Sequence, residues 1–263
     1  TDLKIAWLTD IHLNFLKSTG LHTFLHDLER SDVDAILIGG DIAESGNIVG
    51  YLKEIESVLR IPIYFVLGNH DYYRGSIVET RAKISKFSKE SEYSFWLPES
   101  GIIELSSKVA LIGHGSWADT RLGDYHNSSV ELNDYYMIKE LSNLSRLERM
   151  RVMIELADQA AIFTRKYLPK TIEKYDHVYF LTHVPPFKES TWHLGKMSDE
   201  NWLPHFSCKA GGDLMLDVMQ KYPEKQLTVL CGHTHSSGEA HPLPNITVYT
   251  GQAEYGAPEI QRV

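Results

Sequence analysis

The chain has 263 residues, of which 43% are hydrophobic and 23% are charged, values typical of an ordinary globular protein with one substantial core. Its formal net charge of −9 at pH 7 argues against a protein that grips long nucleic acid through the phosphates. No apolar stretch could span a bilayer, residues 1–13 lack the basic-then-apolar layout of a secretion signal, and two cysteines are too few for a disulfide framework. We therefore expect no membrane partner, no long nucleic acid as a partner, and a cytoplasmic location.

The first ninety residues repeat one pattern three times: an apolar run, a polar turn and an amphipathic segment. The apolar runs occupy 4–13, 34–43 and 61–73, and the amphipathic segments occupy 18–31, 47–59 and 76–90. Near-continuous apolar strands that alternate with helices indicate parallel strands buried on both faces. Ligands of such sheets gather at the carboxyl ends of the strands, so the polar residues there deserve most weight.

The remaining segments predict further strands and a helical insertion. Residues 93–117 predict strands with a hairpin near 106–108, and 128–168 predict a helix with a break near 142–145. This long stretch suggests a helical, cap-like insertion around 120–170. Strand patterns resume at 177–187, 227–236 and 245–256, and a loop rich in tryptophan and histidine fills 188–212. No linker divides the chain, so we predict a single domain over 1–263.

Five of the long apolar runs end on a carboxylate, an imidazole or an amide. These residues are Asp10, His12, Asp41, Asn69, His70, Asp71, His183, His233 and His235. Carboxylate oxygens and neutral imidazole nitrogens suit Mn, Fe and Zn, and no thiolate of a structural zinc site is present among them. Residues i and i+2 of a strand point to the same side, so Asp10 and His12 can bind one ion together. The number of ligand-type residues fits two metal ions that share a carboxylate, ~3.5–4 Å apart.

Each assignment has a simpler alternative. Asp41 and Asn69 follow glycines and are also what tight turns favour. Asp71 fits a structural role, as at a helix N-terminus, better than a catalytic one. Cys208 and Cys231 are interpreted as small buried residues or inert thiols. Two further sets stay open: His22 and His26 as a solvated helix edge or a metal pair, and Trp192, His193, Trp202 and His205 as substrate contacts or loop packing.

The ordered blocks TDIH, GGDIAE, GNHD, THVPP and GHTH, which run from Asp10 to His235, resemble the calcineurin-like metallophosphoesterase superfamily. The resemblance implies an α/β (α+β) fold of four layers, with a central β-sandwich of two mixed sheets flanked by helices. It also implies two groups of metal ligands that share one bridging carboxylate. One ion would be held by Asp10, His12, Asp41 and His235, and the second by Asp41, Asn69, His183 and His233.

By the same resemblance, His70 faces the substrate as a proton donor and is not a ligand. The protein Ser/Thr phosphatase branch carries an Asp-Arg pair where this chain has Glu44 and Ser45, and a glycine where it has Leu13. Glu44 can accept a hydrogen bond from His70 and orient it. Ser45 cannot replace an arginine as a bidentate phosphate clamp, which argues against a protein phosphatase.

Further residues are predicted to contact the substrate. Tyr73, Arg74 and Trp192 are the candidate substrate-binding residues, with Arg74 as a substitute cation. Tyr72, Trp117 and Trp202 are further aromatic candidates beside the site. We predict a binuclear hydrolase of a small organic phosphoester, a diester slightly favoured, that acts through metal-activated hydroxide. The alternatives are a phosphomonoesterase or protein phosphatase, a nuclease, and a non-catalytic metal-binding scaffold.

Overall fold

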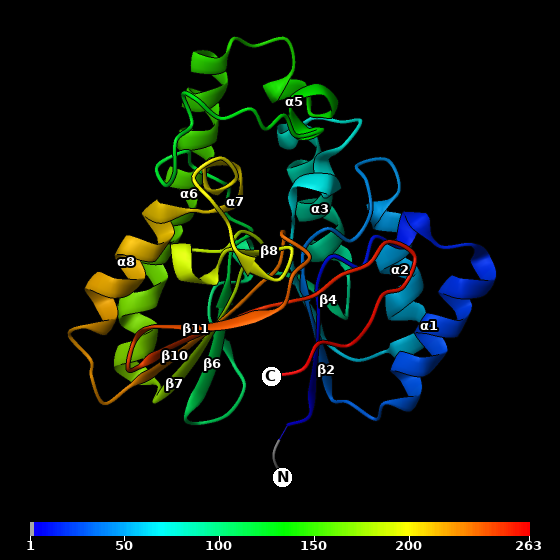
Figure 1. Ribbon diagram of the computed structural model, residues 1–263. Coiled ribbons are helices and arrows are strands. Elements are labelled where there is room, and N and C mark those ends of the chain that lie inside the picture. The colour runs from blue at the N-terminus through cyan, green and yellow to red at the C-terminus, as the bar shows by residue number, and fades with distance from the viewer. Residues whose placement is uncertain (1–2) are drawn as a thin grey trace.

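The first part of the chain builds a four-stranded parallel sheet. In the computed structural model, which describes residues 3–263, its strands lie in the order β1 (Ile5–Leu8), β2 (Ala35–Gly39), β3 (Ile63–Val66) and β4 (Ser94–Trp96). The connecting helices are α1 (Ser18–Arg30), α2 (Ile48–Leu59) and α3 (Ile77–Glu90). They cover one face of this sheet (Figure 1). The predicted strand–helix alternation is confirmed.

The second sheet has six strands and is mixed. Its order is β11 (Gly238–Leu243), β12 (Ile246–Thr250), β10 (Gln226–Cys231), β7 (His177–Leu181), β6 (Val109–Gly113) and β5 (Ile103–Glu104). The four central strands are parallel, whereas β5 and β11 pair antiparallel at the two edges. Helices α6 (Arg146–Lys174) and α8 (Lys209–Met219) pack on its outer face (Figure 1).

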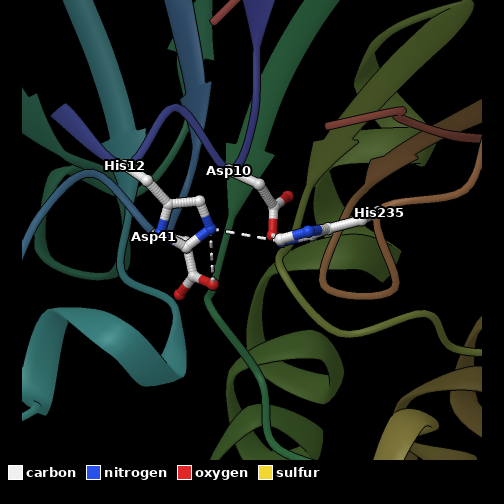
Figure 2. A group of neighbouring side chains, drawn as sticks. All are labelled: Asp10, His12, Asp41 and His235. Carbon is white, nitrogen blue, oxygen red and sulfur yellow. Dashed lines mark hydrogen bonds and ion pairs between the residues drawn. The ribbon is translucent and has the colours of Figure 1, made fainter. Parts of the chain in front are cut away.

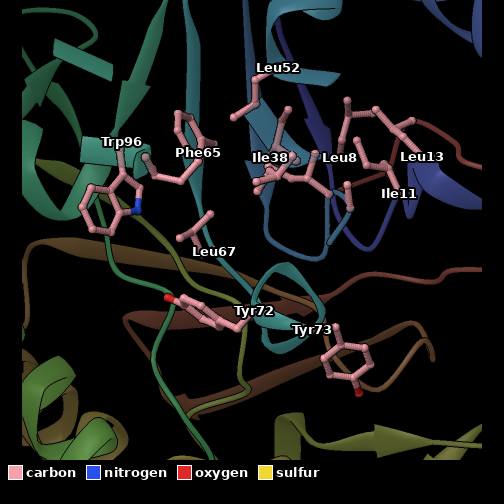
Figure 3. Close-up of a cluster of buried hydrophobic side chains, with 14 of the residues drawn as sticks. Leu8, Ile11, Leu13, Ile38, Leu52, Phe65, Leu67, Tyr72, Tyr73 and Trp96 are labelled. Atoms are coloured by element: carbon pink, nitrogen blue, oxygen red, sulfur yellow. The ribbon is translucent and has the colours of Figure 1, made fainter. Parts of the chain in front are cut away.

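Alternation along each strand separates the layers of the core. Trp7, Leu37 and Val66 point from the first sheet toward the second and pack in one cluster with its inward-facing leucines. Their chain neighbours, such as Leu8 and Phe65, point instead toward the helices of the first sheet (Figure 3). Because side chains alternate with period two, strands that are apolar at every position can serve two cores at once. The four-layer sandwich is thereby confirmed, although the first sheet is purely parallel in its described pairings.

The insertion between β6 and β7 differs from the prediction. Residues 128–133 form no helix; α5 (Asp134–Met137) and a 3-10 turn at Lys139–Leu141 precede the long helix. The predicted break near 142–145 is confirmed, because Ser145 caps α6 through a reciprocal pair of hydrogen bonds with Glu148. The later turns of α6, from Phe163 onward, pack on the second sheet, whereas Met153, Leu156 and Ala157 of its earlier turns join the core cluster of the first sheet.

Short elements complete the described chain. They are 3-10 turns at Leu13–Phe15, Asn69–Tyr72 and Lys188–Ser190, helices α4 (Leu97–Ser100) and α7 (Leu203–Phe206), and strands β8 (Trp192–His193) and β9 (Lys196–Met197). The loop predicted over 188–212 thus contains a small hairpin and the start of α8. Within residues 3–263, no helix is both long and apolar enough to cross a membrane.

Candidate metal centre

The loops after the parallel strands of both sheets meet at one end of the sandwich. Asp10 and His12 follow β1, and Asp41 follows β2. Backbone hydrogen bonds fasten these two loops together, from Asp10 N to Gly40 O at 3.0 Å and from His12 N to Asp41 O at 2.9 Å. The placement that the sequence predicted, with polar residues at the carboxyl ends of the strands, is what brings the candidate ligands together.

The first group consists of Asp10, His12, Asp41 and His235 (Figure 2). One side-chain oxygen or nitrogen from each lies within 4.8 Å of all the others. Nε2 of His235 is 3.3 Å from Oδ1 of Asp10 and 3.1 Å from Nε2 of His12. Two carboxylates and two imidazoles at this spacing can surround a single divalent ion.

A second group lies directly beside the first. Oδ1 of Asn69 is 3.0 Å from Nε2 of His183 and 3.1 Å from Nδ1 of His233. Asp41 faces both groups, because its Oδ1 is 3.4 Å from Nε2 of His183 and its Oδ2 is 3.7 Å from Nε2 of His12. The structure therefore brings all seven predicted ligand residues into two adjoining sets that share Asp41.

Backbone carbonyls orient the two histidines of the second group. Nδ1 of His183 lies 2.8 Å from Gly39 O, which leaves Nε2 facing Asn69. Nε2 of His233 lies 3.0 Å from His205 O, which leaves Nδ1 facing the same oxygen. Donating one ring N–H to an acceptor fixes the tautomer and gives the other nitrogen a free lone pair, the form in which histidine binds a metal.

The backbone at the candidate ligands is strained. Positive φ angles occur at Asp10 (50°), His12 (39°), Asp41 (52°), His233 (73°) and His235 (58°). Asp and His tolerate the left-handed region better than most residues, yet each such position still costs free energy. Strain concentrated on five of the seven candidate ligands indicates that the surrounding structure positions these side chains for a function.

Glycines let other backbone segments approach the two carboxylates. A Cβ added at Gly68 would lie 2.2 Å from Oδ1 of Asp41, and one at Gly232 would lie 2.1 Å from Oδ2 of Asp10. A side chain at either position would therefore overlap a carboxylate oxygen. Gly68 in GNHD and Gly232 in GHTH are thus required by the packing of the candidate ligands, and not by the turns alone.

The electrostatics of the cluster fit a cation. Asp10 and Asp41 are buried, and no lysine or arginine of residues 3–263 pairs with either. Burial and the neighbouring Asp10 raise the pKa of Asp41 well above its usual value. Burial lowers the pKa of His12 to about 2 and that of His233 to about 3, whereas at His235 burial is outweighed by the hydrogen bond and charge of Asp10, which raise the pKa. Two crowded carboxylates among these imidazoles are a donor set whose charge a divalent metal would neutralise.

His70 lies at the edge of the cluster. Its backbone N–H donates to Oδ1 of Asp41 at 2.9 Å, and its Nε2 is 3.9 Å from Oδ2 of the same residue. The ring stacks on Tyr73, with the centroids 4.2 Å apart. Burial lowers the pKa of His70 to about 3. The side chain borders the cavity above the cluster, a position suited to meeting a substrate.

Two predicted neighbours of the site have other partners. The expected hydrogen bond between Glu44 and His70 is not formed among the described residues; Glu44 instead pairs with the guanidinium of Arg74. Arg74 is thereby directed at a carboxylate, and its side chain is 67% exposed, so it does not act here as a free cation for substrate. Glu44 and Arg74 thus bind each other in this structure, and the roles assigned to them stay predictions. The cause of this pairing is tertiary, because Glu44 and Arg74 lie 30 residues apart in the chain and their loops are joined where Ser45 N donates to Tyr73 O at 3.3 Å.

Asp71 supports the loops without facing the cavity. Its carboxylate accepts hydrogen bonds from the backbone N–H groups of Ile42, Ala43 and Gly68, at 2.8, 2.9 and 2.8 Å. These bonds join the loop that carries Asp41 to the loop that carries Asn69. The structural interpretation of Asp71 agrees with this placement.

The tryptophan-rich loop mostly packs on itself. The indole of Trp192 lies against Gly238, where an added Cβ would be 2.2 Å from its Nε1, so the residue does not border the cavity. Trp202 stacks on Phe206 at 5.1 Å. His193 does border the cavity. The substrate contact of Trp192 stays a prediction, and in this structure its neighbour His193 is the residue that borders the cavity.

A cavity of ≈ 500 Å³ opens above the two groups. Tyr73 and His70, which the sequence places on the substrate side, border it together with Asp134 and Tyr255, for which no substrate role was predicted. Asp134 was hidden inside a stretch that looked helical. Tyr255 follows the last strand. Like the candidate ligands, it is a polar residue that comes after an apolar run, and this pattern could have identified it. Its phenol keeps its proton, because burial and the nearby carboxylates raise the pKa to about 12.

A family model described as calcineurin-like phosphoesterase matches residues 3–237, which include every candidate ligand. The chain belongs to the calcineurin-like phosphoesterase family. Its seven candidate ligands provide oxygen and nitrogen donors of the kind that metal-dependent hydrolysis of phosphoric esters needs. The assignment rests on the match across the chain and not on one motif.

Curated relatives and solved structures are more distant. The chain is 28% identical over 138 residues to UDP-2,3-diacylglucosamine hydrolases of Yersinia pseudotuberculosis and Yersinia pestis, covering 48% of this chain and 53% of each relative. It thus spans about half the length of the curated relatives it matches. A phosphopantetheinyl hydrolase of Mycobacterium tuberculosis superposes with a TM-score of 0.66 at 12% identity, over 96% of this chain and 90% of that one. A dimetal phosphatase of Danio rerio gives 0.58 at 12% identity, over 94% and 86%. These likenesses confirm the fold.

Proposed function

We propose that the protein hydrolyses a small organic phosphoester at a centre of two divalent ions, with a diester favoured over a monoester. The observation that carries the proposal is the position of Asp41, whose two oxygens face different groups of ligand-type atoms. A carboxylate between two such sets is the arrangement of two-metal hydrolytic sites. Asp10, His12 and His235 would complete the first set with Asp41.

The second set would consist of Asp41, Asn69, His183 and His233. Its oxygen and imidazole donors suit Mn, Fe or Zn. When bound, two such ions lower the pKa of water and offset the negative charge of the phosphoryl oxygens. The protein's part is to hold the ligands at fixed spacing, which the left-handed backbone and the carbonyls behind His183 and His233 provide.

His70 is proposed as the group that donates a proton or hydrogen bond to the leaving oxygen. It borders the cavity, and the ring of Tyr73 stacked against it restricts its orientation. Glu44 remains a weaker candidate as an orienting residue, because its carboxylate pairs with Arg74. Tyr73 is therefore the more direct support of His70 in this structure.

The walls of the cavity support a small substrate. Leu132, Leu194 and Phe206 border the space above the ligands, so it accepts an extended organic group more readily than a segment of a folded protein. Among residues 3–263 no arginine borders the cavity to clamp the extra charge of a monoester, which supports a diester. The Yersinia relatives are named as hydrolases of a UDP-linked sugar, a small molecule, which supports the same size class.

The test is a substrate panel with measured metal content. Protein loaded separately with Mn, Fe or Zn would be offered bis(p-nitrophenyl) phosphate, p-nitrophenyl phosphate, a phosphoserine protein and single-stranded DNA. We expect two ions per chain by elemental analysis and the highest kcat/KM on the small diester. An Asp41→Asn variant should lose activity together with metal. Faster turnover of the phosphoprotein or the DNA than of either small ester would contradict the proposal.

A further inference from the structure

The C-terminal segment 251–261 connects the two sheets at the metal end of the sandwich. Figure 1 shows this red segment leaving the second sheet, crossing toward α1 and α2, and returning between the sheets. Gly251 N donates to Cys231 O of β10 at 2.8 Å, and Gln261 N donates to Trp7 O of β1 at 2.8 Å. The segment is thus fastened to one strand of each sheet.

The amide of Gln261 closes the segment into a loop. Its Oε1 accepts from Gln252 N at 2.8 Å, and its Nε2 donates to Gln252 O at 2.8 Å. Ala253 N also donates to His235 O at 3.3 Å, which fastens the loop to a candidate ligand. A loop held by a two-point amide bond at its base presents its tip in a defined position.

The tip of this loop carries Tyr255, which lies over the first group of ligands. Its ring centroid is 4.6 Å from that of His12 and 5.1 Å from that of His235. Phe15, from the other end of the chain, lies 4.6 Å from Tyr255 and 5.9 Å from His12. Both rings are accessible: Tyr255 is 47% exposed and Phe15 is 53% exposed.

Resting on the two-metal proposal above, we propose that Phe15 and Tyr255 form a subsite for an aromatic or other flat apolar substituent of the phosphoester. Two exposed aromatic rings held beside a ligand cluster offer faces and edges against which such a group can pack. Each ring neighbours His12, so a phosphoryl group at the first group of ligands would place its substituent within their reach. The family match ends at residue 237, so Tyr255 is a feature of this chain outside the matched region.

Direct binding tests the subsite without turnover. Metal-loaded protein would be titrated by calorimetry with phenylphosphonate and with methylphosphonate, which share the phosphoryl group and differ in the ring. Wild type should bind the phenyl compound about fivefold more tightly, the scale of one aromatic contact. Tyr255→Ala and Phe15→Ala should each reduce this preference while leaving methylphosphonate affinity and metal content unchanged. Tyr255→Phe should keep the preference.

The control is Tyr136→Ala, because Tyr136 is an exposed aromatic residue that, unlike Phe15 and Tyr255, does not neighbour His12. It should behave as wild type. Equal binding of the two phosphonates by wild type, or an unchanged phenyl preference in both alanine variants, would overturn the subsite. Loss of metal in Tyr255→Ala and in Phe15→Ala would also overturn it, since the rings would then support the ligands.

Kinetics separate this inference from the function on which it rests. With methyl p-nitrophenyl phosphate and bis(p-nitrophenyl) phosphate, Tyr255→Ala should raise KM for the second ester about fivefold more than for the first, with kcat little changed. If wild type hydrolyses both esters and this split is missing, the subsite is wrong and the proposed function stands. If wild type hydrolyses neither but the calorimetric preference depends on Tyr255, the proposed function is wrong and the subsite stands.

Discussion

The side-chain amide of Asn69 donates a 2.7 Å hydrogen bond to Oδ1 of Asp134, and the hydroxyl of Tyr73 donates to the same oxygen at 2.6 Å. This arrangement decides which end of the amide faces the second group of ligands. Because the nitrogen is held by Asp134, the oxygen is left beside His183 and His233. Asp134 thus links the ring that supports His70 to the amide that would bind a metal.

Replacing Asp134 with alanine should weaken the second metal. The amide of Asn69 would lose the hydrogen-bond acceptor that orients it. Removal of a group that orients a metal ligand typically lowers metal affinity about 10–100-fold, and we expect a loss of that size here. Elemental analysis after dialysis should show fewer than two ions per chain, with a matching fall in kcat. Asp217→Ala, an exposed aspartate on α8, is the control. Unchanged stoichiometry and affinity in Asp134→Ala would contradict the role of this hydrogen bond.

Gly68→Ala should displace Asp41. The new Cβ would lie 2.2 Å from Oδ1 of Asp41, so the loop must shift at a cost of about 1–3 kcal/mol in the free energy of unfolding. Metal content should fall with it. Gly50→Ala is the matched control, because nothing lies within 4 Å of its added Cβ and it sits inside α2. That variant should be more stable by about 0.5–1 kcal/mol. Urea unfolding measures both, and a metal-replete Gly68→Ala would disprove the packing requirement.

His70→Ala should lower kcat by about 10²–10⁴-fold, the usual scale for loss of a general acid. Metal content should stay at the wild-type value, because this imidazole lies outside both groups of ligands. His26→Ala is the control, since His26 is exposed on α1 beside Glu29. A variant that loses metal along with activity would show His70 to be a ligand.

His114 should make the folded state sensitive to acid. Its Nδ1 accepts a 2.9 Å hydrogen bond from Ser116 N, and burial, reinforced by Arg81, lowers the pKa to about 3. In the unfolded chain this imidazole binds a proton near pH 6.5, whereas in the folded chain it stays neutral down to about pH 3. The stability that the folded state derives from neutral His114 is therefore fully present above pH 6.5 and is lost as the pH falls toward 3. The slope from one group is at most about 1.4 kcal/mol per pH unit.

Urea unfolding at pH 7.5, 6.5 and 5.5 measures this effect. His114→Asn keeps an acceptor for Ser116 N but no titratable ring, so its stability should fall less steeply than that of wild type below pH 6.5. Parallel pH profiles for the two proteins would show that His114 does not carry the effect.

The ligand positions could be predicted from sequence because each is a local signal. A polar residue after a buried apolar run, such as Asp41 after β2, marks a strand end, and the carboxyl ends of parallel strands share one edge. The three strand–helix units and the break before α6 were predicted for the same reason. The contacts between side chains from distant parts of the chain are not encoded in the local sequence, and the predictions of those contacts were weaker.

Three particular residues show the limit. Asp134 reaches Asn69 only because the irregular segment before α6 folds back over the site, which no periodicity indicates. Tyr255 meets Phe15 from the opposite end of the chain. Glu44 was assigned to His70 on chemistry alone, and the arginine that it binds was assigned to the substrate. In each case the deciding interaction depends on tertiary placement.

The left-handed backbone at Asp10, His12, Asp41, His233 and His235 also restricts how this site could be redesigned. Asparagine is tolerated at such positions, whereas β-branched side chains are disfavoured and glycine supplies no donor atom. Converting the centre to a thiolate site would require cysteine in conformations that it rarely adopts, five times over. A new metal preference is therefore easier to introduce at Asn69 and His183, which do not share this conformation, than at the five residues that do.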